Sequence, residues 1–315
     1  MNVRISVVIS THNPVIRRLE RTLRAVAAQT LDAELWELVL VDNASTKPVS
    51  IDKIPWNRGE RRQIREERLG LIFGRLAGIR ASKGGLLVFV DDDNVLAPDY
   101  LQAAMTVFDN REALGVAGGA MEPEWCDAEP ETWASEFVDG FARRNFGGTS
   151  RVASKTDYPS GLPEFSPMGA GMVARRAALT SWVAQAEFST LTGRRGAELA
   201  SCEDTDMVLM AFASGWSIGY FPQLRLTHLI PAHRLSANYL ARLYHDHNKC
   251  WVELLYKHGI CPSTPAAPWT VALRKARAYV RCRAWAGPAE YVNWRRACGH
   301  FEGRAAIYRL SRTGK

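Results

Sequence analysis

Three short apolar runs in the first third of the chain each end in a group of polar side chains, and segments with helical period separate the runs. The runs cover residues 3–10, 37–41 and 86–90, and the polar groups after them are Thr11-His12-Asn13, Asp42-Asn43 and Asp91-Asp92-Asp93. Apolar runs that alternate with amphipathic segments are typical of βαβ units, which build a mainly parallel sheet. Ligands of such sheets bind beyond the carboxyl ends of the strands. We therefore expect the three polar groups to converge on one site.

The remaining pattern predicts an α/β protein with a helical C-terminal extension. Helices are expected at 15–26, 72–79, 98–109 and 202–214, with a further strand near 114–117. The stretch between the second strand and residue 72 is polar and rich in arginine, so we interpret it as a connection. Residues 121–166 have no clean period and are expected to form an irregular insertion. From about Pro231 the pattern becomes helical, which predicts two domains, 1–230 and 231–315.

The composition is that of an ordinary globular protein. With 315 residues, of which 47% are hydrophobic, the chain can form one large or two modest domains. No window approaches the roughly 20 apolar residues of a membrane-spanning helix, and the start lacks the features of a signal peptide. We therefore expect a cytoplasmic protein. Its six cysteines include no Cys-x-x-Cys pair and are expected to be reduced, mostly structural thiols.

The net charge of +7 is concentrated near the C-terminal end. Residues 271–315 contain eleven Lys or Arg and two acidic residues, so this segment carries +9 and the preceding residues about −2. Aromatic residues, among them Trp285 and Trp294, are interleaved with these charges. Such a segment can lie on an anionic membrane or bind nucleic acid, and it is also typical of a solvated helix face. We keep peripheral contact with the inner face of the membrane as an alternative and do not expect nucleic acid.

Three consecutive aspartates, Asp91, Asp92 and Asp93, directly follow the third apolar run. Adjacent carboxylates repel one another, so a cation is expected where the buried strand emerges. Oxygen ligands suit Mg²⁺ or Mn²⁺, and Mg²⁺ is commonly shared between protein carboxylates and substrate phosphates. The alternative is structural, because Asp, Asn and Pro also favour the start of a helix near Pro98.

Several motifs of phosphate binding and catalysis are absent or misplaced. No Gly-x-Gly-x-x-Gly follows a candidate strand, and no Gly-x-x-x-x-Gly-Lys-Ser/Thr occurs. Residues 215–219 fit Gly-x-Ser-x-Gly, but a helix precedes them and a strand follows, so Ser217 is interpreted as a turn residue. His245 and His247 do not share a helix face. His228 is either a core histidine or, beside a metal, a ligand in a Mn²⁺ shell.

Five landmarks within residues 3–235 resemble family 2 inverting glycosyltransferases with the GT-A fold. They are Ser6 to Asn13, Val41 to Ser45, Phe89 to Asp93 with Pro98-Asp99, Gly169 to Met172, and Glu203 to Asp206. Their order and spacing make them specific together. The resemblance implies a GT-A domain over 1–230, a UDP- or dTDP-linked sugar as donor, and a hydroxyl of a glycan, lipid or other molecule as acceptor, as in polysaccharide or glycolipid biosynthesis.

The resemblance also implies roles for individual residues. The nucleotide site comprises Thr11, Asn13, Asp42, Arg75, Asp91 and Asp92, with Arg68 as a substitute for Arg75. Within it, Asp42 accepts a hydrogen bond from the base, while Asp91 and Asp92 orient the ribose. Asp93 binds the Mg²⁺ or Mn²⁺ that bridges the diphosphate, and His228 supplies another ligand. Asp204 acts as the general base, and the donor-sugar and acceptor side comprises Gly169, Ala170, Gly171 and Glu203.

Two other functions fit the same residues. One is a nucleotide-sugar-binding module without catalysis, tethered to a membrane or a partner by the basic tail. The other is a metal phosphohydrolase that uses the aspartates with His245 or His247. Release of nucleoside diphosphate is expected for sugar transfer, whereas inorganic phosphate or nucleoside monophosphate indicates hydrolysis.

Overall fold

The chain folds into two units that are built from interleaved segments. The computed structural model describes residues 3–51, 56, 58–159, 161–187, 193–196 and 198–313. The first unit comprises Met1–Glu124, Ala142–Thr192 and Glu203–Ile230, and the second comprises Trp125–Phe141, Gly193–Cys202 and Pro231–Lys315. The second unit therefore includes two segments that lie, in sequence, within the first.

The first unit contains a mixed sheet, in which nine strands are described. They are β1 (Ile5–Thr11), β2 (Trp36–Asn43), β3 (Glu60–Glu66), β4 (Leu86–Asp91), β5 (Asn94–Leu96), β6 (Leu114–Trp125), β7 (Arg151–Ala153), β8 (Met172–Arg175) and β9 (Ser217–Ile230). Their order is β3-β2-β1-β4-β8-β6-β9-β5, with β7 paired to β9. The strands from β3 to β4 are parallel, whereas β8 pairs antiparallel with β4 and β6, and β9 pairs antiparallel with β5 and β7. The predicted α/β fold class is confirmed.

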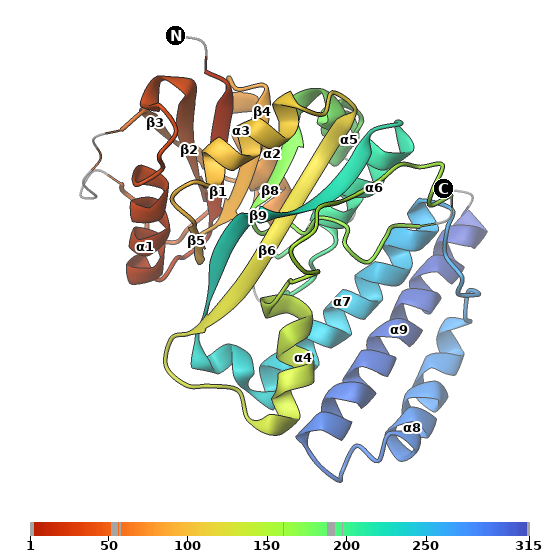
Figure 1. Cartoon of the computed structure of the whole chain (residues 1–315). Helices are drawn as coiled ribbons and strands as arrows, with labels where there is room; N and C mark the ends of the chain where they lie inside the picture. Colours follow the sequence, from red (N-terminus) through yellow and green to blue (C-terminus); the bar gives the residue numbers. More distant parts are fainter. Residues whose placement is uncertain are drawn as a thin grey trace. The chain divides into compact units, whose positions relative to one another are not determined.

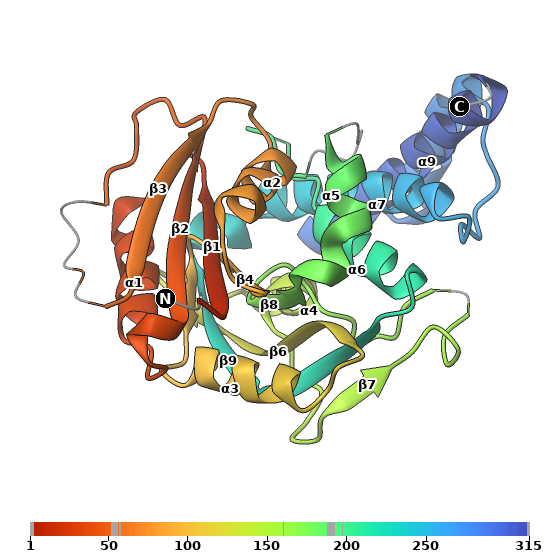
Figure 2. The same cartoon turned by 90° about the horizontal axis from the view of Figure 1, so that it is seen from above.

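Helices cover both faces of this sheet (Figure 1). They are α1 (Ile16–Ala27), α2 (Leu71–Ala81), α3 (Tyr100–Asp109), α5 (Thr180–Ala186) and α6 (Glu203–Ala213), with short 3-10 helices η1 (Ala33–Leu35) and η2 (Arg176–Leu179). Figure 2 shows α1 and α3 on one face and α2 and α5 on the other. Successive strand residues point to opposite faces. Val7 therefore packs in the core under α1 and α3, and its neighbour Val8 in the core under α2 and α6.

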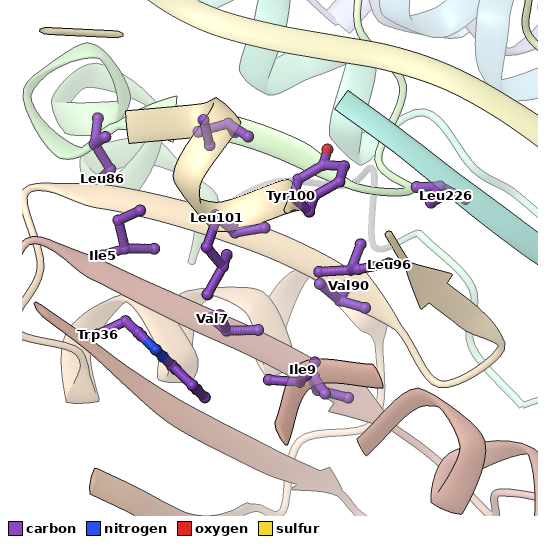
Figure 3. Packing of buried hydrophobic residues seen from close by; sticks show 14 of the residues in the cluster. Ile5, Val7, Ile9, Trp36, Leu86, Val90, Leu96, Tyr100, Leu101 and Leu226 are labelled. Atoms are coloured by element: carbon purple, nitrogen blue, oxygen red, sulfur yellow. The ribbon is translucent and has the colours of Figure 1, made fainter. Parts of the chain in front are cut away.

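The core under α3 connects the sheet to the loop before β8. Figure 3 shows Val7 and Ile9 of β1 with Tyr100 and Leu101 of α3 in this cluster. Tyr100 is fully buried, and its hydroxyl donates a hydrogen bond to the carbonyl oxygen of Gly171. The same packing that builds the core therefore also holds that loop.

Three elements of the first half differ from the prediction. β3 occupies the stretch interpreted as a connection, and its position at the edge of the sheet explains why charged residues are tolerated there. β6 extends to Trp125 instead of ending near residue 117. Helix α4 (Thr132–Ala142) lies inside 121–166, where Ala134, Phe137 and Val138 are buried at the spacing of one helix face.

The second unit is helical. It contains most of α4, η3 (Ala232–Leu235), α7 (Ala237–Lys257), η4 (Pro268–Thr270), α8 (Val271–Arg281) and α9 (Pro288–Thr313). Figure 1 shows α9 between α7 and α8. A Cβ on Gly299 or Gly303 of α9 would collide with backbone carbonyl groups of α7, so glycine permits the close approach of these helices. No helix in the described part of the chain is long and apolar enough to cross a membrane.

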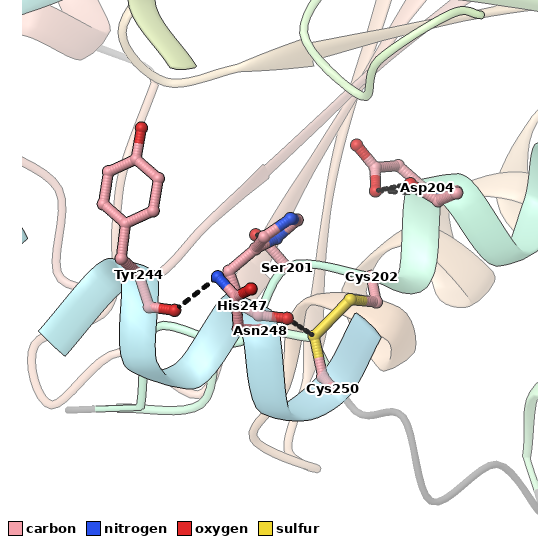
Figure 4. The surroundings of a disulfide bond; sticks show 8 residues. Ser201, Cys202, Asp204, Tyr244, His247, Asn248 and Cys250 are labelled. Carbon is pink, nitrogen blue, oxygen red and sulfur yellow. Dashed lines mark hydrogen bonds between the residues drawn. A yellow bond between two sulfur atoms is a disulfide. The ribbon is translucent and has the colours of Figure 1, made fainter. Parts of the chain in front are cut away.

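A disulfide joins Cys202 to Cys250 of α7 within the second unit (Figure 4). The two Cα atoms lie 6.4 Å apart, and both cysteines are buried. This bond corrects the expectation of reduced thiols for these two cysteines. The sequence spacing could not reveal it, because 48 residues separate the partners and only folding brings them together.

The double variant Cys202→Ser/Cys250→Ser is expected to have a lower free energy of unfolding, because the bond restricts the 48-residue loop in the unfolded chain. Closing such a loop corresponds to about 4 kcal/mol. Guanidinium unfolding followed by circular dichroism measures the change. Cys261→Ser, which replaces a thiol outside the disulfide, is the control. Equal stability of the double variant and the control would contradict the bond.

Candidate active site

The strand ends that were predicted to converge do so in the structure. β1 pairs with β2 so that Thr11 lies opposite Asp42, and it pairs with β4 so that Ser10 lies opposite Asp91. The strand order reverses at β1, since β2 lies on one side of it and β4 on the other. Ligands of open α/β sheets bind at such a reversal. The three polar groups therefore share one edge of the sheet.

Asp42 is buried at this edge, with 1% of its surface exposed. Its Oδ1 accepts a hydrogen bond from the Ser45 N–H at 3.1 Å, while its Oδ2 accepts from the Val49 N–H at 3.2 Å and from Arg65 at 2.8 Å. Burial acts to raise the pKa of Asp42, but the hydrogen bonds of Ser45 and Val49 and the charge of Arg65 outweigh it, and the pKa is lowered. Asp42 is therefore an ionised acceptor that is fixed at this edge of the sheet.

Hydrogen bonds join the loop after β1 to the loop after β2. Asn13 adopts a left-handed backbone conformation with φ 47°, which asparagine tolerates better than most residues. Its N–H donates to Ser45 Oγ at 2.9 Å, and its Oδ1 accepts from the Thr46 N–H at 2.9 Å. His12 Nδ1 lies 2.8 Å from the carbonyl oxygen of Asn43. The two loops therefore hold each other in place at the sheet edge.

The aspartates after β4 have different partners. The Thr11 hydroxyl donates to Asp92. Asp93 is buried, and its Oδ1 accepts from Asn94 Nδ2 at 3.1 Å and lies 3.6 Å from Nε2 of His228. His228 reaches this position because β5 pairs with β9 in a register that sets it opposite Asn94. A single divalent ion with ligand bonds of about 2.1 Å can span the separation of these two atoms.

Arg75 lies among carboxylates, with 3% of its surface exposed. Its Nη2 lies 3.6 Å from Asp91 Oδ1, and its Nη1 lies 3.3 Å from Glu203 Oε1. The guanidinium also sits 5.7 Å from the centre of the Phe89 ring. Burial acts to lower the pKa of Arg75, but the surrounding carboxylates, Glu203 foremost, outweigh it and raise the pKa. Arg75 therefore joins α2, the end of β4 and the first turn of α6 in one charge network.

Asp204 stands in the first turn of α6 and is held by two backbone amides. Its Oδ2 accepts a hydrogen bond from the Gly169 N–H at 2.7 Å, and its Oδ1 accepts from the Thr205 N–H at 2.7 Å. A Cβ on Gly169 would lie 2.5 Å from Arg75 Nη2 and 3.0 Å from Asp204 Oδ2. The small residues before β8 thus permit the close approach of this loop to Arg75 and Asp204.

Gly171 completes this loop in a conformation that favours glycine. Its φ is 69°, and a Cβ there would collide with Leu226 and approach the Tyr100 hydroxyl at 2.9 Å. Ala170, between the two glycines, packs against the core under α3. Of the predicted group, the structure therefore brings Gly169 to the side of Asp204, while Ala170 and Gly171 hold the same loop on the core under α3.

Arg144 is a further cation near Asp204, and none of the sequence motifs includes it. It donates hydrogen bonds to the carbonyl oxygens of Glu164 and Ser166, and it lies over the Phe146 ring at 4.9 Å. Burial lowers the pKa of Arg144 to about 10, although the charge of Asp204 opposes this change. No local pattern marks this arginine, because it lies in the segment expected to be irregular and meets Asp204 only through folding.

Three other residues considered in the sequence, Arg68, His245 and Ser217, have partners outside the group around Arg75 and Asp204. Arg68, the substitute for Arg75, forms surface ion pairs with Glu66 and Glu187. His245 lies within ion-pair distance of two carboxylates of the second unit. Ser217 is the first residue of β9 and donates a hydrogen bond to the Ala113 carbonyl oxygen.

One group in the second unit has the side chains of a metal site. Cys202, His247 and Cys250 lie close enough together for their ligand atoms to share an ion. Cys202 and Cys250 are, however, bonded to each other. A disulfide lacks the thiolates that bind metal ions, so the group has a structural role in this state.

Two family models match the chain. The model of Glycosyl transferase family 2 matches residues 6–157, and that of Glycosyl transferase family group 2 matches residues 86–245. The second match covers half of the chain and includes β4, the loop before β8 and the start of α6.

Two relatives with assigned activities are similar over most of the chain. The glucosyl-dolichyl phosphate glucuronosyltransferase of Haloferax volcanii is 23% identical over 265 residues, which are 80% of this chain and 78% of the relative. The N-acetylglucosaminyltransferase of Mesorhizobium japonicum is 23% identical over 231 residues, which are 72% of this chain and 51% of the relative. The match thus spans about half the length of the second relative.

Solved structures of S. aureus TarS share the fold. The 1–349 fragment in complex with UDP-GlcNAc has a TM-score of 0.53 at 14% identity, covering 98% of this chain and 92% of that chain. The longer TarS structure has a TM-score of 0.54 at 13% identity, covering 97% of this chain and 55% of that chain. At this identity the likeness shows the fold alone.

Gly169→Ala is expected to lower the free energy of unfolding by about 1–3 kcal/mol, because the new methyl group overpacks a buried network in which Arg75 cannot retreat without losing its carboxylates. Guanidinium unfolding measures the change. Gly85→Ala is the matched control, since a Cβ there meets no atom within 4 Å. A loss no larger than that of the control would show that the loop before β8 has more room than the structure gives it.

Proposed function

Because the chain belongs to glycosyltransferase family 2 and has the GT-A fold, we propose that it transfers a sugar from a nucleoside-diphosphate sugar to a hydroxyl of a glycan or lipid, with inversion of the anomeric centre. One contact supports this proposal above all others. Arg75 joins Asp91, at the end of β4, to the first turn of α6, where Asp204 stands. This supports a single site for the nucleotide and the general base.

The proposed donor carries UDP or dTDP. Asp42 is a buried, ionised acceptor at the sheet edge, and the N3–H of a uracil or thymine base is a donor to such a carboxylate. Thr11 lies opposite Asp42 in the sheet, and Asn13 bonds to the loop that follows Asp42. Asp91 and Asp92 are proposed to orient the ribose. S. aureus TarS binds UDP and UDP-GlcNAc in its crystal structures, which supports a uridine nucleotide.

The proposed cofactor is Mg²⁺ or Mn²⁺, held by Asp93 and His228. A carboxylate oxygen and an imidazole nitrogen suit Mn²⁺ in particular, and their separation of 3.6 Å fits one ion. When bound, the ion stabilises the negative charge of the departing diphosphate. The hydrogen bond from Asn94 restricts rotation of the Asp93 carboxylate, so this ligand is preorganised.

Asp204 is the proposed general base. The acceptor hydroxyl must lose a proton as it attacks the anomeric carbon, and a positioned carboxylate can take that proton. The N–H groups of Gly169 and Thr205 orient the Asp204 carboxylate and leave lone-pair positions for the hydroxyl. Attack on the face opposite the leaving diphosphate inverts the anomeric centre.

Glu203 is proposed to act on the donor side through Arg75. The family resemblance implies a place for it on the donor-sugar and acceptor side together with Gly169, Ala170 and Gly171, yet only 2% of its surface is exposed and it pairs with Arg75. A buried carboxylate of this kind holds the guanidinium in place, and the guanidinium in turn supports Asp91. The three residues of the loop before β8 remain the proposed wall of the sugar site.

The proposed acceptor is a lipid-linked glycan or a polysaccharide. The name of the Haloferax volcanii relative specifies glucosyl-dolichyl phosphate, and that of the Mesorhizobium japonicum relative specifies N-acetylglucosamine transfer. We therefore also propose peripheral contact with the inner face of the membrane through residues 271–315, which carry a net charge of +9. A lipid-linked acceptor is presented at such a surface.

Asp204→Asn is expected to lower turnover by about 10²- to 10⁴-fold while the affinity for UDP stays unchanged, because only proton transfer is lost. Initial rates of nucleoside diphosphate release and calorimetric titration with UDP measure the two effects. Asp109→Asn, which removes a surface carboxylate paired with Arg4, is the control. Full turnover of Asp204→Asn would remove this residue from the mechanism.

The same assay of the wild-type protein distinguishes the alternatives. UDP binding without nucleoside diphosphate release, over a panel of sugar and lipid acceptors, would favour a binding module. Release of inorganic phosphate or nucleoside monophosphate would indicate a phosphohydrolase.

Asp93→Ala is expected to abolish the part of UDP affinity that depends on Mg²⁺ or Mn²⁺, because the ion loses its carboxylate ligand. Titration of UDP with added Mn²⁺ and with a chelator measures this part. Asp99→Ala, which removes an exposed carboxylate paired with Arg225, is expected to behave like the wild type. If the wild type binds UDP equally well with and without chelator, the proposed cofactor is wrong.

A further inference from the structure

Large apolar side chains are concentrated on one short segment of the second unit. Among the described residues, ten large apolar side chains are exposed, and five of them fall within residues 269–285. They are Trp269 with 75% exposure, Leu273 with 55%, Tyr279 with 38%, Val280 with 63% and Trp285 with 59%. Single exposed apolar residues are ordinary, but a contiguous group marks an interaction surface.

Four exposed side chains form a stripe along this segment. Trp269 in η4 and Leu273, Ala276 and Val280 in α8 recur at intervals of four, three and four residues, which is the period of one helix face. We call these four residues the α8 stripe. Trp285 follows the turn at Arg283, so the exposed segment has a tryptophan at each end.

The charge beside the α8 stripe is entirely positive. Residues 269–286 contain no acidic residue and five basic ones, which are Arg274, Lys275, Arg277, Arg281 and Arg283. Lys275 pairs with Glu302 of α9. Arg277, Arg281 and Arg283 form no ion pair with any carboxylate in the described ranges. Their charge is therefore available to an external partner.

The other face of α8 is already occupied by α9. Ala278 is buried, and the Lys275 carbonyl oxygen accepts a hydrogen bond from Trp294 Nε1 at 3.0 Å. The Tyr279 and Trp294 rings meet edge to face with their centres 5.2 Å apart. Trp269 of the α8 stripe meets Tyr308 of α9 edge to face at 6.1 Å but keeps 75% of its surface exposed. The α8 stripe is therefore a surface and not part of the core.

We propose that α8 lies in the plane of an anionic lipid bilayer, with the α8 stripe at the boundary of headgroups and acyl chains and Arg277, Arg281 and Arg283 at the lipid phosphates. A helix with an apolar face and an arginine-rich polar face is typical of interfacial helices. Tryptophan is favoured at this depth because its ring is amphipathic. The inference deepens the proposed peripheral contact of residues 271–315, on which it rests, by assigning it to one helix face.

Charge and apolar surface together favour a bilayer over other partners. A second copy of the chain would bring this positive face against itself, and like charges repel. Nucleic acid would pair with the arginines, but phosphate contacts do not account for the exposed Leu273 and Val280. An anionic bilayer accommodates both features.

Flotation with vesicles tests whether the α8 stripe contributes to membrane binding. The wild type is expected to bind vesicles of phosphatidylcholine and phosphatidylglycerol, to bind phosphatidylcholine alone much less, and to be released by salt. Trp269→Ser/Leu273→Ser/Val280→Ser is expected to lose at least about tenfold in affinity for the anionic vesicles. Its circular dichroism spectrum is expected to be unchanged, because these side chains are exposed. Val152→Ser/Tyr158→Ser, which changes exposed apolar residues of the first unit, is expected to bind like the wild type.

Charge reversal tests whether the arginines of α8 contribute to membrane binding. Arg277→Glu/Arg281→Glu is expected to lower binding about tenfold or more, whereas Arg17→Glu/Arg24→Glu, which alters the net charge equally on α1, is expected to keep it. Equal losses in both pairs, undiminished binding of the serine variant, or equal binding to uncharged vesicles would overturn the proposal. Self-association or nucleic acid binding that requires Arg277 and Arg281, together with no binding to vesicles, would also overturn the proposal.

Turnover with a water-soluble acceptor is measured on the same variants and is expected to match the wild type, since none of the changed residues belongs to the candidate active site. This separates the two proposals. A protein that floats with vesicles but transfers no sugar contradicts the proposed function alone. A protein that transfers sugar but does not float contradicts the assignment of α8 alone.

Discussion

The buried guanidinium of Arg75 is the interaction on which the candidate site depends. A carboxylate or an arginine buried alone is very costly, and a buried ion pair that loses one partner typically costs about 3–5 kcal/mol. Glu203 and Arg75 are both almost fully buried and neutralise each other, and the partly exposed Asp91 lies 3.6 Å from Nη2 of the same guanidinium. Because the buried pair comes from α6 and α2, each of its charges is compensated only when both helices are in place. Folding of this region and assembly of the site are therefore coupled.

The two cores of the sheet determine where this network lies. Alternate residues of β1 face opposite cores, so a shift of pairing by one residue would exchange every buried side chain between the faces. Such a shift is strongly unfavourable. The register of β1 with β2 and β4 is thus set by ordinary apolar packing, and that register aligns Thr11 with Asp42 and Ser10 with Asp91. The positions of these polar residues are therefore determined by apolar contacts on the two faces of the sheet.

The sequence predicts those parts whose signal is local. Apolar runs and helical period predict most of the helices and strands, and the residues after the strands predict the polar groups of the site. Strand β3 was not predicted, because its edge position tolerates the polar sequence Glu-Arg-Arg-Gln-Ile-Arg-Glu. Contacts between distant segments carry no such signal. The meeting of Asp93 with His228 requires the pairing of β5 with β9, and the influence of Asp204 on Arg144 joins residues that are 60 positions apart in the chain. The family resemblance supplied Asp204 and His228, which periodicity alone would have left among ordinary helix-start and core residues.

The bond between Cys202 and Cys250 makes the intervening polypeptide a covalent ring that contains α6 and β9. Asp204 and His228 both belong to this ring. One cut in its backbone, by a protease or by hydrolysis, leaves the fragments connected through sulfur. A nicked molecule therefore keeps the residues on either side of the cut in a single covalent assembly, and separating them takes a reductant or a second cut.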